Sequence, residues 1–135
     1  MCYAFVIHLH QSPTAEPHYD LMLQPPHAGE DAALATWRLA CRPEHMALGT
    51  SQPAERIADH PPHFLTYEGP LSRAGGDVRI HDCGTYTLDE CREQRWRMTL
   101  HGRQVHGGFE LRRVAARQWR LVRLDDTLTP PDPPE

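Results

Sequence analysis

The feature that most constrains the fold is a pair of short segments near the start of the chain, in which side chains alternate with the period of a β-strand. In residues 2–10, CYAFVIHLH, the alternation separates two faces, Phe5, Ile7 and Leu9 against Val6, His8 and His10. In residues 18–24, HYDLMLQ, it separates Tyr19, Leu21 and Leu23 from His18, Asp20 and Met22. Residues 11–17, QSPTAEP, contain two prolines and no periodicity, which indicates a connection between two strands that lie side by side.

Histidine and aspartate gather on one face of this predicted strand pair. His8, His10, His18 and Asp20 would converge on one patch of the surface. Imidazole and carboxylate together suit a first-row divalent cation, and three protein ligands leave coordination positions open for water or substrate. The pattern therefore predicts a metal site. Five other histidines are better explained as surface or hydrogen-bonded residues: His27, His45, His63, His101 and His106.

Further strand-like segments follow, separated by turn signals, whereas helical periodicity is nearly absent. They span residues 35–41, 77–82, 84–88, 95–101, 108–114 and 118–124. Between Arg42 and Pro62 we expect an irregular stretch with at most a short helical turn near residues 54–58. The three tryptophans fall in alternating strands and are expected in the core. The fold class is therefore predicted as all-β: a small closed or partly open antiparallel β-barrel with long loops and at most a short helix.

Length and charge narrow the organisation and the partners. At 135 residues we expect a single domain over residues 1–126, followed by a Pro-rich flexible tail over residues 127–135. The net charge of -4 excludes a global basic field of the kind that drives non-specific DNA binding. All 14 cationic residues are arginine, and from Arg92 to Arg123 they outnumber the carboxylates. A local phosphate-binding surface is therefore compatible with the acidic total.

The four cysteines are widely spaced and form no C-x-x-C pair, so neither a zinc ribbon nor a disulfide framework is indicated. The N-terminus lacks a charged region followed by a long apolar run, and no stretch approaches the length needed to cross a bilayer. We therefore expect a reduced, cytoplasmic protein with no membrane partner.

The order of several motifs resembles the 3'-phosphoesterase domain of bacterial DNA ligase D and its small stand-alone relatives. The motifs are FVIHLH, HYDLML, TWRLA, ADHPPHFLTYEGPLS, HDCGTY, LHGRQVHGGFELRRV and WRLVRLDD, and they cover about residues 5–126 in family order. The resemblance implies a β-barrel with a manganese-dependent site, where Zn²⁺ or another divalent metal is an alternative. It implies an enzyme of DNA end repair that removes a terminal ribonucleoside and then the 3'-phosphate. Its implied partners are DNA or RNA–DNA 3' ends and a repair ligase or polymerase.

The same resemblance assigns the expected site residues. His10, His18 and Asp20 fall on the family's metal ligands, and His60 falls on the histidine that contacts the scissile phosphate. All four are expected to be catalytic. His10 lies two residues further from His18 than the usual family spacing, and His8 is the alternative ligand.

Several phosphate-contacting positions depart from the family pattern. Met22 stands where the family usually has an arginine, on the same strand face as the expected ligands, and Phe64 stands where it usually has a tyrosine. The family's phosphate-contacting lysine has no plain counterpart, although Arg42 lies close by. Losing one charge-assisted phosphate contact typically costs about 1.5–3 kcal/mol. The candidates to replace the missing guanidinium as a phosphate ligand are Arg38, Arg56 and Arg79.

Two functions from different classes fit this sequence. The first is a metal-dependent phosphoesterase acting on nucleic-acid 3' ends. The second is a catalytically degenerate module that keeps the metal for structure or for holding a terminal phosphate. A metal-dependent phosphatase of small molecules is a weaker third alternative.

Overall fold

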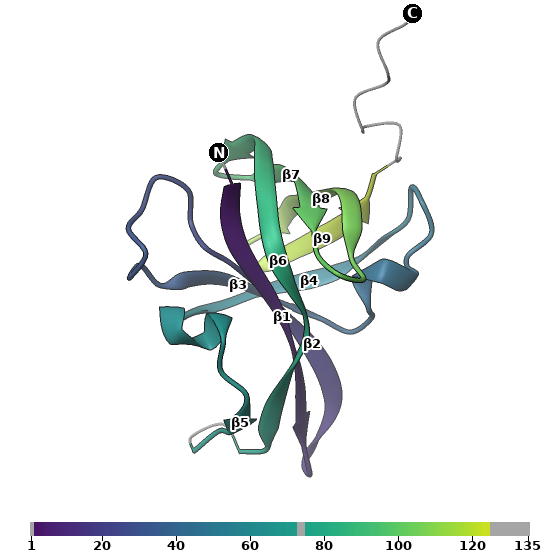
Figure 1. Ribbon diagram of the computed structural model, residues 1–135. Coiled ribbons are helices and arrows are strands. Elements are labelled where there is room, and N and C mark those ends of the chain that lie inside the picture. The colour runs from purple at the N-terminus through teal and green to yellow at the C-terminus, as the bar shows by residue number, and fades with distance from the viewer. Residues whose placement is uncertain (1, 73–74, 125–135) are drawn as a thin grey trace, which may run out of the picture.

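The computed structural model describes residues 2–72 and 75–124, so the expected tail over residues 127–135 lies outside the described residues. The described residues form nine strands and two short 3-10 turns. Figure 1 shows how they are arranged. The strands are β1 (Cys2–Ser12), β2 (Ala15–Leu23), β3 (Leu34–Leu39), β4 (Ser51–His60), β5 (Gly69–Pro70), β6 (Asp77–Arg92), β7 (Arg95–His101), β8 (His106–Ala115) and β9 (Gln118–Arg123). The turns are η1 (Pro43–His45) and η2 (Pro62–Leu65). In the described part of the chain, no helix is long and apolar enough to cross a membrane.

The nine strands form one sheet that curls back on itself. Their order is β1-β2-β3-β4-β9-β8-β7-β6-β5, and an additional pairing of β1 with β6 closes the ring. Every described strand pair is antiparallel. Closure leaves only short edges, which is how antiparallel barrels avoid an exposed ladder of unpaired backbone groups. The predicted fold class, an all-β antiparallel barrel, is confirmed.

The interior of the ring is filled by the apolar face of each strand. From the first two strands these are Phe5, Ile7, Tyr19, Leu21 and Leu23, as the alternation predicted. Trp37 lies at the centre, fully buried, with the rings of Trp96 and Trp119 edge-on to it at 5.4 and 5.5 Å between centroids. The three tryptophans therefore serve the core, as expected from sequence.

One prediction was wrong: the stretch between Arg42 and Pro62 is not irregular, because its second half is strand β4. Pro53 lies inside β4 although proline donates no hydrogen bond to a sheet, and its side chain is exposed. The only fully buried apolar residue of the strand is Ala54. Inward-facing Gln52 is polar, and its amide bonds the backbone N–H and C=O of Cys41 at 3.0 and 2.9 Å. A strand with so little apolar alternation does not show the period-2 signal.

Two further boundaries differ from expectation. The connection predicted over residues 11–17 is a tight turn, because β1 runs to Ser12 and β2 begins at Ala15. The segments predicted at residues 77–82 and 84–88 are one long strand, β6. Gly84 lies within it where the backbone oxygen of His101 approaches so closely that a β-carbon would lie 2.1 Å away. The glycine permits this close approach and does not interrupt the strand.

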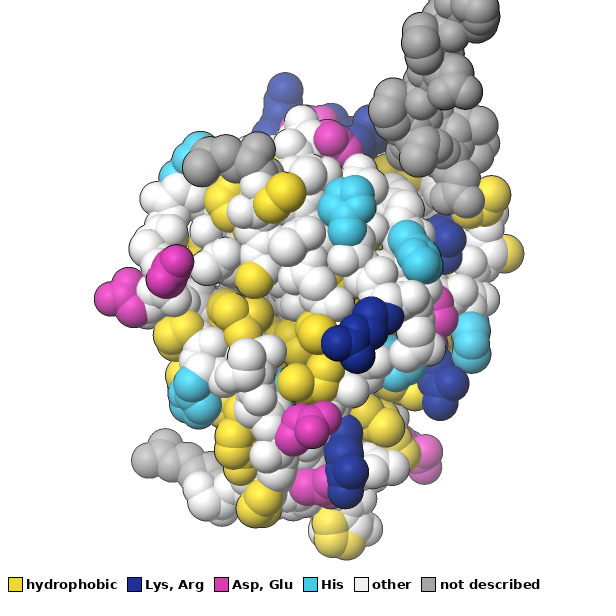
Figure 2. Space-filling model, viewed as in Figure 1, with side chains coloured by type: hydrophobic (Ala, Val, Ile, Leu, Met, Phe, Trp, Pro, Cys, Tyr) yellow, Lys and Arg dark blue, Asp and Glu magenta, His cyan; other side chains and the backbone are white. Residues whose placement is uncertain are grey.

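The outer face of β1 and β2 is partly covered. A small apolar cluster of Val6, Met22 and Leu34 lies there, and Phe64 and Leu65 of η2 pack onto it. The buried side chain of His8 therefore lies between the barrel wall and the η2 segment, with its ring centroid 5.8 Å from that of Phe64. Figure 2 shows this side of the molecule, where acidic, basic and histidine side chains are intermixed with apolar ones.

Candidate active site

Three of the predicted residues bring their donor atoms to one point on the outer face of the β1–β2 pair. His10 pairs with His18 across the two strands, and Asp20 lies two residues further along β2. His10 Nδ1 lies 3.1 Å from His18 Nε2, which lies 3.4 Å from Asp20 Oδ1. One donor atom from each of the three lies within 4.8 Å of the others. Period-2 geometry puts all three side chains on this face.

The hydrogen bonds of this metal-ligand cluster (His10, His18 and Asp20) favour metal binding. His10 Nε2 donates to the backbone oxygen of Gly75 at 3.1 Å, which leaves Nδ1 unprotonated and directed at His18. The His18 Nε2 proton then lies between His10 Nδ1 and Asp20 Oδ1, the position that a metal ion would take with release of that proton.

Burial and spacing also suit a divalent ion. Asp20 is 4% exposed, and its Oδ1 completes no hydrogen bond within the described residues. A tetrahedron of metal–ligand bonds of 2.0–2.1 Å needs donor separations of about 3.3–3.4 Å. Two of the three observed separations, 3.1 and 3.4 Å, lie close to that value, and the third lies within 4.8 Å. The residues present therefore fit a His/His/Asp metal site, and their chemistry admits Mn²⁺, Zn²⁺ and other first-row ions.

His8, the alternative ligand, lies beside this cluster and is not one of the three convergent residues. It pairs with Asp20 across β1 and β2 and is completely buried. Burial lowers the pKa of His8; the nearby Asp20 carboxylate and the carbonyls of Phe64 and Tyr67 oppose the shift, and His60 reinforces it. The carbonyls of Phe64 and Tyr67 lie near the ring, but neither ring nitrogen completes a hydrogen bond of normal geometry within the described residues. A buried imidazole with both nitrogens unsatisfied is costly, and such groups mark functional positions.

His60 reaches the same face because strand β4 contains an extra residue. Leu34 pairs with His60 and Thr36 with Ile57, so β4 spans three residues where β3 spans two. This bulge reverses the alternation, which would otherwise have directed His60 inward like Ala54. The rings of His60 and His8 both pack on Phe64, at 5.3 and 5.8 Å between centroids. His60 Nδ1 donates to the oxygen of Ala58 at 2.9 Å, which leaves Nε2 available to a ligand.

Of the three candidate replacement cations, Arg38 lies at the cluster. It pairs with Asp20 across β2 and β3, and its Nε lies 3.8 Å from Asp20 Oδ1. Its side chain is 44% exposed, so the guanidinium can contact both the carboxylate and an incoming anion. Arg56 instead lies over the ring of Trp37, and Arg79 pairs with Asp77.

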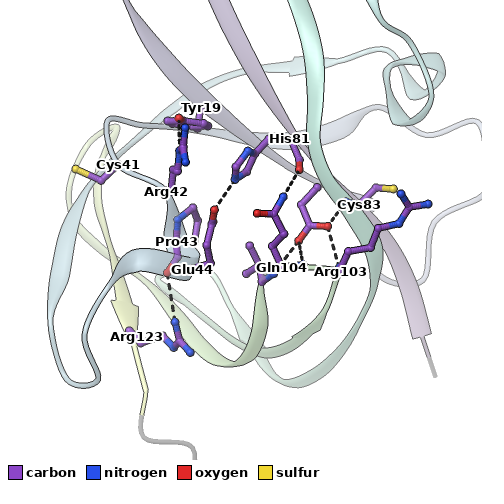
Figure 3. A network of polar contacts seen from close by, with 12 residues as sticks. Tyr19, Cys41, Arg42, Pro43, Glu44, His81, Cys83, Arg103, Gln104 and Arg123 are labelled. Atoms are coloured by element: carbon purple, nitrogen blue, oxygen red, sulfur yellow. Dashed lines mark hydrogen bonds and ion pairs between the residues drawn. The ribbon is translucent and has the colours of Figure 1, made fainter.

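Arg42, the nearest cation to the missing lysine, is engaged elsewhere. Its Nε donates to the hydroxyl of Tyr19 at 2.8 Å (Figure 3). Tyr19 belongs to the inward face of β2, opposite the metal-ligand cluster. Arg42 therefore supports the barrel and does not face the candidate site.

Met22 is on the predicted face but is inaccessible there. It is 1% exposed and is covered by Phe64 and Leu65 of η2. The side chain of an arginine introduced at this position would lie against these two apolar side chains. Position 22 therefore does not point freely toward a bound phosphate, because the η2 segment fills that space.

A closed antiparallel β-barrel with a His/His/Asp cluster on its outer face defines a protein with a candidate divalent-metal centre. The chain belongs to the DNA Ligase D 3'-phosphoesterase domain family, whose sequence model matches residues 8–113. It is 26% identical over 138 residues to the Multifunctional non-homologous end joining protein LigD of Mycolicibacterium smegmatis. That match covers 90% of this chain and 17% of the relative, so the chain spans about a sixth of its length. The resemblance seen in the motifs is confirmed, and the family is one of hydrolases.

Proposed function

We propose that this protein is a metal-dependent phosphoesterase that removes a 3'-phosphate or a 3'-ribonucleotide from nucleic-acid ends. The observation that carries the proposal is the convergence of two sets of groups on one face. The metal-ligand cluster, with its unsatisfied buried carboxylate oxygen, lies beside His8, and the ring of His60 packs on the same Phe64 as that of His8. Family membership supports the reaction class, and the end-joining relative supports a role in DNA end repair beside a ligase or polymerase.

Each residue has a role that follows from its surroundings. His10, His18 and Asp20 would hold the ion, and Mn²⁺ is the ion we propose. When bound, a divalent ion supplies Lewis-acid activation of the phosphoryl group and of the attacking water. Arg38 adds a permanently charged, forked donor beside Asp20, suited to a phosphate oxygen.

His60 is placed to handle a proton. Its Nδ1–H is held by the Ala58 carbonyl, so its Nε2 is the atom that faces a ligand. In the protonated ring this nitrogen donates to a phosphate oxygen or protonates the leaving oxygen.

The four cysteines are free thiols, which supports our proposal that the protein works in the reducing cytoplasm.

A primer–template duplex with a 3'-phosphate tests the proposal. We expect phosphate release with Mn²⁺ and none after chelation. Asp20→Asn should lose both Mn²⁺ binding, measured by calorimetry, and turnover. His60→Gln should keep Mn²⁺ binding while turnover falls by about 10²–10⁴-fold. His106→Gln, a change at an exposed histidine on β8, is the matched control and should behave as wild type.

The second candidate function is a binding module without catalysis, and the observation that favours it is the buried Met22 in place of a phosphate-binding arginine. Such a module would bind Mn²⁺ and a 3'-phosphorylated end without releasing phosphate. Absence of phosphate release with every divalent ion tried, in a protein that binds the metal stoichiometrically, would establish this second function and refute the first.

A further inference from the structure

The basic residues of this acidic protein are concentrated in its last four strands. From Arg92 to Arg123 there are nine arginines against two glutamates, Glu93 and Glu110. The β6–β7 and β8–β9 turns lie at the same end of the barrel, where the backbone N–H of Arg113 donates to the oxygen of Gln94 at 2.9 Å. Strand pairing therefore gathers arginines from two hairpins at one end of the sheet.

Two adjoining hollows lie at this end. The first, of about 590 Å³, is lined by Arg56, Arg113 and Arg117 among others, and the second, of about 530 Å³, by Arg92, Arg95 and Arg112. They share Glu93 and Arg113 as wall residues. We refer to the two hollows together as the arginine groove.

The arginine groove leads to the candidate active site. A further hollow of about 350 Å³ is lined by His60 and Phe64, and it shares Ala58 and Asp59 with the first hollow. The hollow at His60 and the first hollow of the arginine groove therefore adjoin at residues 58 and 59 of strand β4.

The arginines of the first hollow are held in place but keep donors available. Arg113 Nε bonds the oxygen of Ala116 at 2.8 Å, and Arg117 Nη1 bonds the oxygen of Arg56 at 3.1 Å. The guanidinium of Arg56 lies 4.5 Å from the Trp37 ring centroid, and its Nη2 lies 3.4 Å from Asp59 Oδ1. A guanidinium has five N–H donors, so each of these can still bind phosphate oxygens. Fixed, solvent-facing guanidinium groups are suited to a polyanion whose charges are regularly spaced.

We propose that the arginine groove binds the phosphate backbone of the nucleic acid whose 3' end lies at the metal-ligand cluster. This inference rests on the proposed function for its location. Arg56 and His60 are four residues apart on β4, which corresponds to roughly 10–13 Å given the bulge between them. Nucleotides advance about 3.4 Å each along one strand of B-form DNA. The groove therefore begins about three to four nucleotides from the reacting end.

Fluorescence anisotropy with a 16-base-pair duplex ending in a 3'-hydroxyl tests the groove without requiring turnover. We expect wild-type protein to bind this duplex more tightly than a labelled trinucleotide, which is too short to reach the groove. The Arg113→Ser/Arg117→Ser double variant should bind the duplex about tenfold more weakly, with the slope of log K against log salt smaller by about two. Arg92→Ser, which removes a 74% exposed side chain paired with Glu90 at 2.7 Å, should reduce the slope by about one.

Arg103→Ser is the matched control, because Arg103 is exposed on the loop at the opposite end of β7 and β8 and should leave affinity and slope unchanged. Equal affinity and slope for wild type, the double variant and Arg92→Ser would overturn the inference even if 3'-phosphate is hydrolysed. Duplex binding that depends on Arg113 and Arg117 in a protein that hydrolyses nothing would support the groove and refute the enzymatic function.

Discussion

Asp82 is the residue whose replacement we expect to damage the fold most, although it takes no part in the proposed chemistry. Its carboxylate is 3% exposed and accepts four backbone N–H groups. Oδ1 bonds Cys83 and Arg103, both at 2.9 Å, and Oδ2 bonds Gln104 at 3.0 Å and Val105 at 2.8 Å. One side chain on β6 thus accepts the hydrogen bonds of three backbone N–H groups in the loop that joins β7 to β8.

Asp82→Asn keeps the shape of the side chain and removes half of this acceptor capacity. The amide oxygen can still receive two N–H groups, whereas the NH₂ group is a donor that faces the other two. Each buried N–H left without an acceptor costs about 1–3 kcal/mol. We therefore expect the free energy of unfolding to fall by about 2–6 kcal/mol, a large share of the 5–15 kcal/mol typical of a domain.

Urea unfolding of the metal-free protein, followed by circular dichroism, measures this loss. Asp89→Asn is the matched control, because it changes the same charge at an exposed position of the same strand and should lie within about 0.5 kcal/mol of wild type. If Asp82→Asn unfolds at the wild-type midpoint, or if both variants lose the same stability, the acceptor argument is wrong.

Lowering the pH should also reduce the stability of the wild-type protein, because it protonates the Asp82 carboxylate. Burial raises the pKa of Asp82, but the four N–H groups outweigh it and hold the pKa below its usual range. The unfolded chain therefore binds a proton at a higher pH than the folded chain, and stability falls as the pH drops below about 4 and through the folded pKa. In Asp82→Asn this contribution to the pH dependence should be absent.

At two other buried positions we expect substitutions to change stability in opposite directions. His8→Leu should raise the free energy of unfolding of the chelated protein by about 1–3 kcal/mol, because it removes two unsatisfied buried nitrogens, while turnover falls; a lower midpoint in urea would show that the ring has partners. Met22→Arg should lower the melting temperature, since a guanidinium would be buried beneath Phe64 and Leu65; an unchanged melting temperature would show that the η2 segment opens readily.

The fold could be predicted wherever a strand is apolar on one face and polar on the other. Residues 2–10 and 18–24 show that alternation, and their inward and outward faces were assigned correctly. Strand β4 was missed because its buried inward positions are occupied by Gln52 and Ala54. A polar and a small side chain there differ little in hydrophobicity from the outward positions of the strand. Packing against β3 and β9, and not its own pattern, makes this segment a strand.

The site was predictable only where it depends on a single hairpin. His10, His18 and Asp20 lie on two strands joined by one turn, so period-2 spacing was enough to bring them together. The direction of His60 depends on one extra residue in β4, and a bulge leaves no clear trace in a single sequence. Arg38 could not be distinguished from Arg56 or Arg79, because that choice requires the register between β2 and β3.

The loss of arginine at position 22 and the position of Arg38 are connected through the packing of the outer face. An apolar Met22 allows Phe64 and Leu65 to close over Val6, which buries His8 beside Asp20. A guanidinium at position 22 would have to remain beneath that cover, whereas Arg38 approaches Asp20 from the neighbouring strand with its side chain 44% exposed. In the proposed site, Arg38 can thus contact the Asp20 carboxylate and an incoming phosphate while its guanidinium stays hydrated. An arginine at position 22 would have to bury its charge to make the same contacts. In the proposed site, the anion-binding cation therefore comes from β3, one strand away from position 22.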